Sequence, residues 1–326
     1  MADRILVVAE HREGKLNRAS LEALAAAQAL CRDSGWAVDC VLPGSGQEEP
    51  AQELAAHCPE RLYLLESPAL LQYTSDAYVS ALKPFLEERQ PRLTLFPHTY
   101  QVRDYAPRLA LAMGRGLISD ATGYRFEQDR LVFTRQMFQG KFLADVAFVG
   151  GSPWLATVQI GSFRPAPRAA SPAPIEKVAA AEAETLRVTP HEVFQGAKQA
   201  VDLTQAATIV AVGRGIKEQK NLALAEELAR VLGGEIAASR PICDNGWLPM
   251  ERQVGSSGQT VTPKLYIAIG ISGAIQHIVG MKGAGAIVAI NKDPEAPIFE
   301  IADYGIVGNL FDFVPLLTEE IRKARA

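Results

Sequence analysis

Four strand-like runs in the C-terminal part of the chain are each followed by small or hydrogen-bonding residues. The runs cover 207–212, 235–238, 265–269 and 286–290. They are followed by Gly213-Arg214-Gly215, Ser239-Arg240-Pro241, Gly270-Ile271-Ser272-Gly273 and Asn291-Lys292-Asp293. If the runs are strands of a parallel sheet, their carboxyl ends meet at one edge, where α/β folds bind ligands. We therefore expect the residues that follow them to line one crevice.

The residue types in this crevice suit an anionic ligand. Ser272 and Gly273 are expected to open a helix, whose free N–H groups and dipole would face the crevice. Arg214 and Arg240 add fixed positive charge. The loop 253–259, Gln-Val-Gly-Ser-Ser-Gly-Gln, allows the backbone to approach a planar ligand closely. Together these features indicate a dinucleotide, without specifying which one.

Two common nucleotide-binding signatures are absent from the sequence. The segment 213–218 lacks the third glycine of G-x-G-x-x-G, and no Walker A sequence occurs. A generic NAD dehydrogenase is therefore unsupported. No Cys-x-x-Cys motif or Cys/His cluster is present either, and we predict no metal site.

The N-terminal part alternates strand and helix signals, which predicts a largely parallel sheet covered by helices. Apolar runs cover 5–9, 38–42, 62–65 and 93–96, and helical patterns cover about 20–32 and 78–88. Three later runs, 131–135, 144–149 and 154–160, are separated by short turns. We interpret these three as antiparallel strands that close the first domain.

A proline-rich segment follows the first domain. Residues 163–174 contain four prolines, which favours a linker or an extended surface strap. Beyond it, a helix over 221–232 is expected to stop at Gly233, and a closing helix to cover about 310–324. We predict an α/β protein of two domains. The first covers 1–190 and ends in the Pro/Ala-rich linker, and the second, 200–326, is a doubly wound parallel sheet.

Composition narrows the function classes. The length of 326 residues fits two domains, and the net charge of −4 gives no reason to expect nucleic acid as a partner. No apolar stretch reaches about 18 residues, so no membrane span is predicted. The N-terminus leads directly into the run 5–9 without a targeting segment, so we expect a cytoplasmic, bacterial protein.

Four scattered cysteines, Cys31, Cys40, Cys58 and Cys243, lie mostly in or beside apolar patterns. We predict buried free thiols, which suits a reducing compartment. Disulfides are the alternative.

The C-terminal motifs resemble those of electron-transfer flavoprotein α subunits. The matching segments are 253–258 (Gln-Val-Gly-Ser-Ser-Gly), 263–268 (Pro-Lys-Leu-Tyr-Ile-Ala), 270–277 (Gly-Ile-Ser-Gly-Ala-Ile-Gln-His), 289–294 (Ala-Ile-Asn-Lys-Asp-Pro) and 302–307 (Ala-Asp-Tyr-Gly-Ile-Val). The similarity covers about 205–320, and the N-terminal half matches more loosely. The resemblance implies FAD bound mainly by the second domain, at an interface with a β subunit that pairs with the first.

The resemblance also assigns residues to the cofactor. Arg214 would contact it near the phosphates and Ser239 would hydrogen-bond it. Arg240 would lie over the flavin ring and stabilise its anionic reduced form, and His277 would lie near the flavin O2. The remaining implied contacts are Gln253, Val254, Gly255, Ser256 and Ser257 around the flavin; Ser272, Gly273, Ala274, Ile275 and Gln276 at the phosphates and ribityl chain; Asn291 at the phosphate–ribose region; and Asn309 and Leu310 at the adenine.

The sequence departs from the family pattern in two places. The family often has Gln-Thr where this chain has Ser256-Ser257, and often Asp where it has Asn309. The first difference shortens a polar side chain beside the flavin, and the second removes a charge.

Several of these residues also have structural interpretations. Arg214 and Arg240 would each be explained by a salt bridge, His277 by packing in a helix, and Ser256-Ser257 by a flexible turn. His98, which follows the run 93–96, is interpreted as part of a structural or vestigial site rather than a catalytic one.

The implied function is an electron carrier without catalytic residues of its own. Its FAD would take electrons from a flavin-containing dehydrogenase of fatty acid or amine oxidation and pass them to a quinone-linked oxidoreductase. One alternative is a subunit of an electron-bifurcating flavoprotein that oxidises NADH, with a second FAD in the β subunit. AMP is the other cofactor that the β subunit could hold. A flavin-free structural paralogue and an enzyme with its own pocket near His98 are further alternatives.

Overall fold

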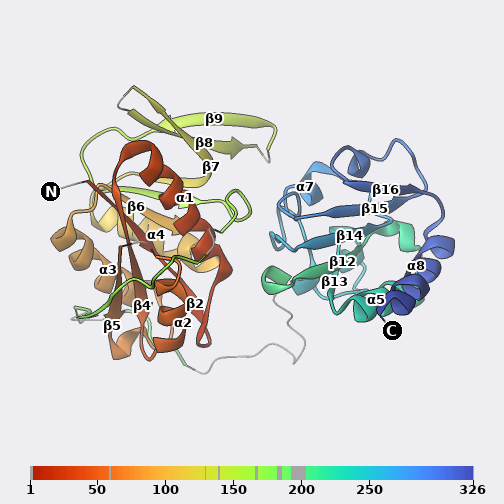
Figure 1. The fold of residues 1–326 in the computed structure, drawn as a ribbon, viewed down its shortest axis with the longest axis horizontal. Helices are drawn as coiled ribbons and strands as arrows, with labels where there is room; N and C mark the ends of the chain where they lie inside the picture. The colour runs from red at the N-terminus through yellow and green to blue at the C-terminus, as the bar shows by residue number, and fades with distance from the viewer. Residues whose placement is uncertain are drawn as a thin grey trace. The chain divides into compact units, whose positions relative to one another are not determined.

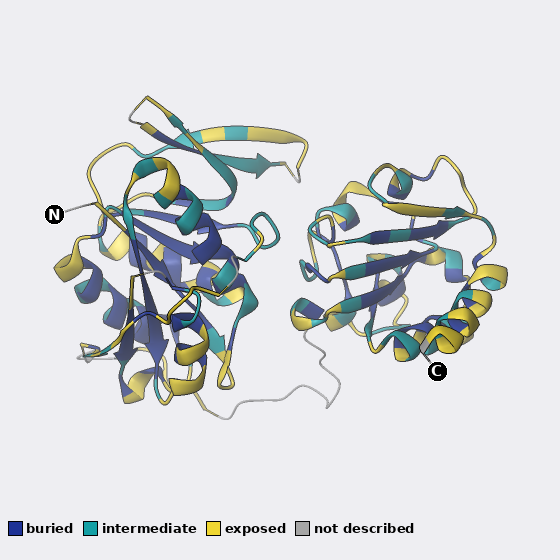
Figure 2. Ribbon diagram, viewed as in Figure 1, coloured by how far each residue is buried: buried dark blue, intermediate teal, exposed yellow. Residues whose placement is uncertain are grey.

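The computed structural model describes residues 3–58, 60–128, 130–138, 140–165, 168–181, 186–191 and 203–325. The chain divides into two compact units, with the main boundary between residues 193 and 194. Each unit contains a parallel or largely parallel sheet with helices packed on it (Figure 1). Figure 2 shows that the central strands of both sheets are buried.

The first unit has a nine-stranded sheet in the order β11-β5-β4-β1-β6-β10-β7-β8-β9. Its strands are β1 (Arg4–Val8), β4 (Ala37–Gly44), β5 (Arg61–Glu66), β6 (Leu93–Pro97), β7 (Leu117–Glu127), β8 (Arg130–Met137), β9 (Phe142–Ala147), β10 (Trp154–Val158) and β11 (Ile175–Ala179). A small ribbon of β2 (His11–Arg12) and β3 (Lys15–Leu16) lies outside this sheet. Its helices are α1 (Arg18–Ser34), α2 (Glu48–Ala55), α3 (Ser75–Arg89) and α4 (Tyr100–Ala112).

Two hydrophobic cores lie on the two faces of this sheet. Side chains of α1 and α2, such as Leu24 and Leu54, belong to one core, and side chains of α3 and α4, such as Leu82 and Leu109, belong to the other. Helix boundaries follow their caps: the Asn17 side chain accepts a hydrogen bond from Ala19 N, and α1 ends at Gly35 in the left-handed conformation.

The prediction that 154–160 forms an antiparallel strand is wrong. β10 pairs in parallel with β6 and with β7. Among the described strands of this sheet, only the β7–β8 and β8–β9 pairs are antiparallel. The short turn before β10 does not make a hairpin, because β10 inserts between β6 and β7 and buries Leu155 and Ala156. β7 was not predicted, because its residues are mostly half-buried and give no strong apolar run.

The proline-rich segment is a strap where the structure describes it. Ala173 N donates to Ala55 O at 2.9 Å, and Leu62 N donates to Pro174 O at 3.0 Å. The chain then forms β11, which pairs in parallel with β5 at the edge of the sheet. Residues 166 and 167 of this segment lie outside the described residues.

The second unit has a five-stranded, all-parallel sheet in the order β13-β12-β14-β15-β16. Its strands are β12 (Thr208–Val212), β13 (Glu235–Ala238), β14 (Leu265–Ile269), β15 (Ile287–Asn291) and β16 (Tyr304–Val307). Helices α5 (Leu222–Leu232) and α8 (Leu310–Arg325) pack on one face. Two short helices, α6 (Arg240–Asp244) and α7 (Ile275–Ile278), follow β13 and β14. As predicted, α5 ends at Gly233, which has a φ of 65°.

All four cysteines are free; Cys40, Cys58 and Cys243 are buried, and Cys31 is partly exposed. We expect a thiol-specific reagent to modify Cys31 rapidly in the native protein. The three buried thiols should react only after unfolding, because a buried thiol must first be exposed. Counting the thiols that react before and after addition of denaturant checks this. Rapid modification of more than one thiol would contradict it, and Cys31→Ser is the control that removes the fast phase.

Among the described residues, no helix is both long and apolar enough to span a membrane. The same residues contain no group of three or more His, Cys, Asp or Glu side chains placed to hold a metal ion.

Candidate cofactor-binding site

The sequence-predicted site residues gather beyond the carboxyl ends of the strands of the second sheet. Arg214 follows β12, and Ser239 and Arg240 follow β13. Ser272 to His277 follow β14, Asn291 is the last residue of β15, and Asn309 and Leu310 follow β16. The loop 253–257 returns to the end of β13, where Val254 N donates to Ala238 O at 2.9 Å. The structure therefore brings the segments after the five strands, together with the loop 253–257, to one edge of the sheet.

The strand order reverses between β12 and β14. From β12 the chain goes to β13 on one side and then to β14 on the other, which opens a crevice of the kind that binds ligands in doubly wound sheets. Across this point Gly213 N donates to Ile269 O at 2.9 Å and Gly215 N donates to Gly270 O at 3.0 Å. A Cβ on Gly215 would lie 2.6 Å from Gly270 Cα. Glycines are thus required for the two loops to meet.

The glycine-rich loop 253–259 is held from both sides. Ser256 N donates to Gln276 O at 2.7 Å, and Gln253 Nε2 donates to Ser257 Oγ at 2.9 Å. Gly255 has a φ of 142°, and a Cβ there would lie 2.7 Å from Gln276 O. The backbone hydrogen bonds make this a defined loop rather than a free turn, with exposed hydroxyls at Ser256 and Ser257.

The two arginines of the crevice differ in whether another side chain of the protein already pairs them. Arg214 is exposed, and its side chain makes no hydrogen bond or ion pair within the described part of the chain. Arg240 Nε lies 3.3 Å from Asp244 Oδ2, with 66% of the arginine side chain exposed. Ser239 precedes α6, but its hydroxyl does not cap that helix. The salt-bridge interpretation therefore applies to Arg240 and not to Arg214.

His277 is buried and held as a neutral ring. Its Nε2 lies 3.0 Å from Tyr266 Oη, and only 6% of its surface is exposed. Burial lowers the pKa of His277 to about 4. Tyr266 was not among the predicted site residues, because it lies inside the apolar run 265–269 and has the pattern of a core residue.

Two buried polar atoms of the predicted site have no hydrogen-bond partner among the described residues. They are Nδ1 of His277 and Oε1 of Gln253. Buried polar atoms are nearly always paired in native proteins, so unpaired ones in neighbouring loops fit a polar ligand that would satisfy them. With the uncommitted Arg214, this donor and acceptor set fits a negatively charged, hydrogen-bonding cofactor such as FAD.

The prediction that Ser272 and Gly273 open a helix is wrong. The helix begins at Ile275 and spans one turn, α7. Gly273 has a φ of 85°, and Ala274 has a ψ of 141°, so neither residue is helical. One turn provides little dipole. The anion preference of the crevice therefore comes mainly from its arginines.

Asn291 and Asn309 use their side chains to hold the loops. Asn291 Nδ2 donates to Ile271 O at 2.9 Å, and Asn291 Oδ1 accepts from Asp293 N at 3.0 Å. Asn309 Nδ2 donates to Asp312 Oδ2 at 3.0 Å beside the start of α8. Leu310 is buried in the core beneath α8, with 6% exposed. Direct cofactor contacts of these three residues stay predictions.

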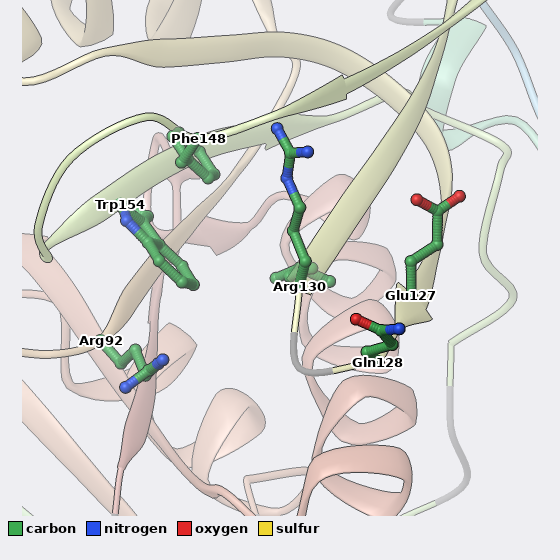
Figure 3. Close-up of a pocket in the computed structure, with 7 residues that line it drawn as sticks. Arg92, Glu127, Gln128, Arg130, Phe148 and Trp154 are labelled. Atoms are coloured by element: carbon green, nitrogen blue, oxygen red, sulfur yellow. The ribbon is translucent and has the colours of Figure 1, made fainter.

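The cavity drawn in Figure 3 lies in the first unit and not in this crevice. It has a volume of about 410 Å³ and is lined by Arg92, Glu127, Gln128, Arg130, Leu131, Phe148 and Trp154. Trp154 and Phe148 stack with ring centroids 5.5 Å apart. The Arg92 guanidinium lies 5.0 Å from the Trp154 ring centroid and pairs with Asp3 at 3.1 Å. These contacts explain Arg92 as a packing residue.

His98 lies in a network that joins three strands of the first sheet. Its Nδ1 lies 2.7 Å from Thr157 Oγ1, and its Nε2 lies 3.7 Å from Asp120 Oδ1. Asp120 in turn accepts from Gln159 Nε2 at 3.2 Å. These contacts join the loop after β6 to β7 and to the end of β10, which favours the structural interpretation.

We expect the stability of the second unit to fall as the pH decreases from 6.5 towards 4. The ordinary pKa of His277, 6.5, is lowered to about 4 on folding, so over this range the unfolded state binds the proton and the folded state does not. The full effect is about 3 kcal/mol in the free energy of unfolding. Chemical denaturation at a series of pH values measures it. His277→Gln should remove this part of the slope, and an unchanged slope would contradict the assignment.

Two family models match the chain. The Electron transfer flavoprotein domain matches residues 5–183, and the Electron transfer flavoprotein FAD-binding domain matches residues 202–282. The electron transfer flavoprotein subunit alpha of Thermoanaerobacterium thermosaccharolyticum is 40% identical over 324 residues, with 98% of each chain covered. The subunit of the same name from Bacillus subtilis is 39% identical, with 99% of this chain and 98% of the relative covered. The acryloyl-CoA reductase electron transfer subunit beta of Anaerotignum propionicum is 35% identical, with 98% of this chain and 96% of the relative covered.

Proposed function

Because the chain belongs to the electron-transfer flavoprotein α-subunit family, we propose that it binds one FAD in the crevice of its second domain and carries electrons between other flavin- and quinone-linked enzymes. The observation that supports this most directly is the convergence of five strand-end loops on one edge of the sheet. These loops carry the uncommitted Arg214 and the unpaired Nδ1 of His277.

The residues of the crevice fit the parts of an FAD molecule. Bound FAD supplies reversible one- and two-electron redox chemistry. Arg214 provides positive charge for the pyrophosphate, aided by the backbone of 270–274. Arg240 provides positive charge for a flavin ring that becomes more negative on reduction. The loop 253–257 provides a close backbone surface and exposed hydroxyls for the planar ring.

We propose that the first domain, residues 1–190, pairs with a β subunit and that residues 200–326 form the flavin-binding domain. Both relatives named electron transfer flavoprotein are subunits of a larger assembly, as their names state. The proposed donors are flavin-containing dehydrogenases of fatty acid or amine oxidation, and the proposed acceptor is a quinone-linked oxidoreductase.

A second candidate function is an electron carrier dedicated to an acyl-CoA reductase. It is favoured by the 35% identity to the acryloyl-CoA reductase electron transfer subunit over nearly the whole chain. In that arrangement the β subunit would hold a second FAD and oxidise NADH.

An anaerobic reductive titration of the chain co-expressed with a β subunit tests both functions. One FAD per heterodimer, reduced in two successive one-electron steps and unreactive with NADH, is the expected result. Two FAD molecules per heterodimer with rapid reduction by NADH would favour the second candidate. A heterodimer that binds no flavin would overturn the proposal.

A further inference from the structure

Tyr266 and His277 form a buried hydrogen-bonded pair in the second unit. Tyr266 lies in the second position of β14, and His277 lies in α7, which follows that strand (Figure 1). The Tyr266 Oη–His277 Nε2 distance is 3.0 Å, and 0% of Tyr266 and 6% of His277 are exposed. The tyrosine packs in an apolar cluster with Val254, Val261 and Met281.

The direction of this hydrogen bond follows from the donors and acceptors that remain available on the tyrosine hydroxyl and the imidazole ring. Burial raises the pKa of Tyr266 far above its usual value, so its hydroxyl keeps its proton. That hydroxyl has no second hydrogen-bond partner among the described residues. If Nε2 of His277 carried the ring proton, the tyrosine O–H would lie in an apolar core without an acceptor, which is costly. The tyrosine therefore donates, and Nε2 accepts.

A neutral imidazole that accepts at Nε2 must carry its proton on Nδ1. Nδ1 is buried, and it has no hydrogen-bond partner among the described residues. The backbone of Val254 raises the pKa of the ring and so partly offsets the effect of burial. It does not, however, meet the geometry of a hydrogen bond to Nδ1. The ring thus has one N–H without a hydrogen-bond partner of normal geometry among the described residues.

We propose that Tyr266 is a positioning residue that holds His277 in the Nδ1–H form, so that a neutral ring donates a hydrogen bond to an acceptor atom of the bound flavin. This inference rests on the proposed binding of FAD in the crevice. A fixed N–H donor stabilises an acceptor more strongly when that acceptor gains negative charge on reduction. Tyr266 therefore contributes to the reduction potential without touching the cofactor.

The first test is the position of the ring proton, read by nitrogen NMR of the flavin-loaded heterodimer with isotope-labelled histidine. The chain has five histidines, and His277→Gln identifies the signals of His277 by their loss. At neutral pH we expect a protonated Nδ1 and an unprotonated Nε2. This measurement needs no change at Tyr266, so it holds even if a variant there fails to fold.

The second test is the flavin midpoint potential of Tyr266→Phe. Loss of the hydroxyl releases the constraint on the ring, and we expect a mixture of the two neutral forms. The potential should become more negative, by the amount that corresponds to a roughly three- to tenfold loss in the affinity for reduced relative to oxidised flavin. Tyr304→Phe is the matched control in the same domain, since Tyr304 is 68% exposed, and it should change neither readout.

The outcomes separate this inference from the proposed function. A flavin-loaded heterodimer with the proton on Nε2, or a Tyr266→Phe variant with altered stability but an unchanged potential, would overturn the inference and leave the proposed function standing. Absence of flavin from the wild-type heterodimer would overturn both. A proton on Nδ1 together with the negative shift of the potential supports both.

Discussion

Replacing Gly270 with alanine should destabilise the second domain strongly and abolish flavin binding. Gly270 has a φ of 61°, which an L-residue adopts only at a cost. Its new Cβ would lie 2.7 Å from Gly215 Cα and 3.1 Å from Gly215 N, and these are backbone atoms that cannot rotate away. The strained φ and the overpacking together should cost about 2–5 kcal/mol in the free energy of unfolding.

The loss of flavin follows from where the displacement occurs. Gly270 O accepts the hydrogen bond from Gly215 N, so moving either loop separates β12 and β14 at the point where the strand order reverses. Arg214 and Ser272 lie within two residues of this contact. Denaturant unfolding of the heterodimer and the flavin content after gel filtration measure the two effects.

Gly246→Ala is the matched control for this prediction. Gly246 has a φ of 69°, and a Cβ there would meet no atom within 4 Å. It therefore carries the cost of the left-handed backbone, about 1–2 kcal/mol, without the overpacking. Equal losses of stability and flavin in the two variants would show that the close approach of Gly215 and Gly270 has no special role.

Strand positions in the second domain could be predicted closely from the sequence. The bounds of β13 and β14 agree with the predicted runs, because each is a short, mainly apolar segment bounded by glycine or polar residues. β16 escaped prediction because it is a short edge strand, Tyr-Gly-Ile-Val, with mostly exposed residues and no apolar run. In the first domain the partner of β10 could not be predicted, since the same apolar run fits a parallel or an antiparallel neighbour.

The candidate site, like the fold, could be predicted from the sequence only in part. Arginines, serines and glycines at strand ends could be found from residue type and position alone. The partner of His277 could not, because Tyr266 is eleven residues away in sequence and its hydroxyl lies in an apolar strand. The bond from Asn291 to Ile271 likewise depends on which strands are neighbours, and local sequence does not contain that information.

Arg240→Gln should weaken flavin binding while leaving the fold intact. The guanidinium is 66% exposed, and its only ion pair among the described residues is with Asp244 on the same short helix, so it contributes little to stability. A charge-assisted contact with the flavin, in contrast, is expected to raise affinity by roughly ten- to a hundredfold. The loss should be larger for reduced than for oxidised flavin, because the reduced ring carries more negative charge, and the midpoint potential should therefore become more negative.

Arg230→Gln is the matched control, since Arg230 is also exposed and paired with an acidic residue, Glu227, on helix α5. Flavin affinity and potential should be unchanged there, and a similar loss in both variants would indicate a general effect of net charge.

Asp244→Asn should shift the flavin midpoint potential in the opposite direction to Arg240→Gln. Removing the carboxylate 3.3 Å from Arg240 leaves the guanidinium without its competing anion, so the midpoint potential should become more positive. If Asp244→Asn and Arg240→Gln shifted the potential in the same direction, the charge of Arg240 would not act on the flavin.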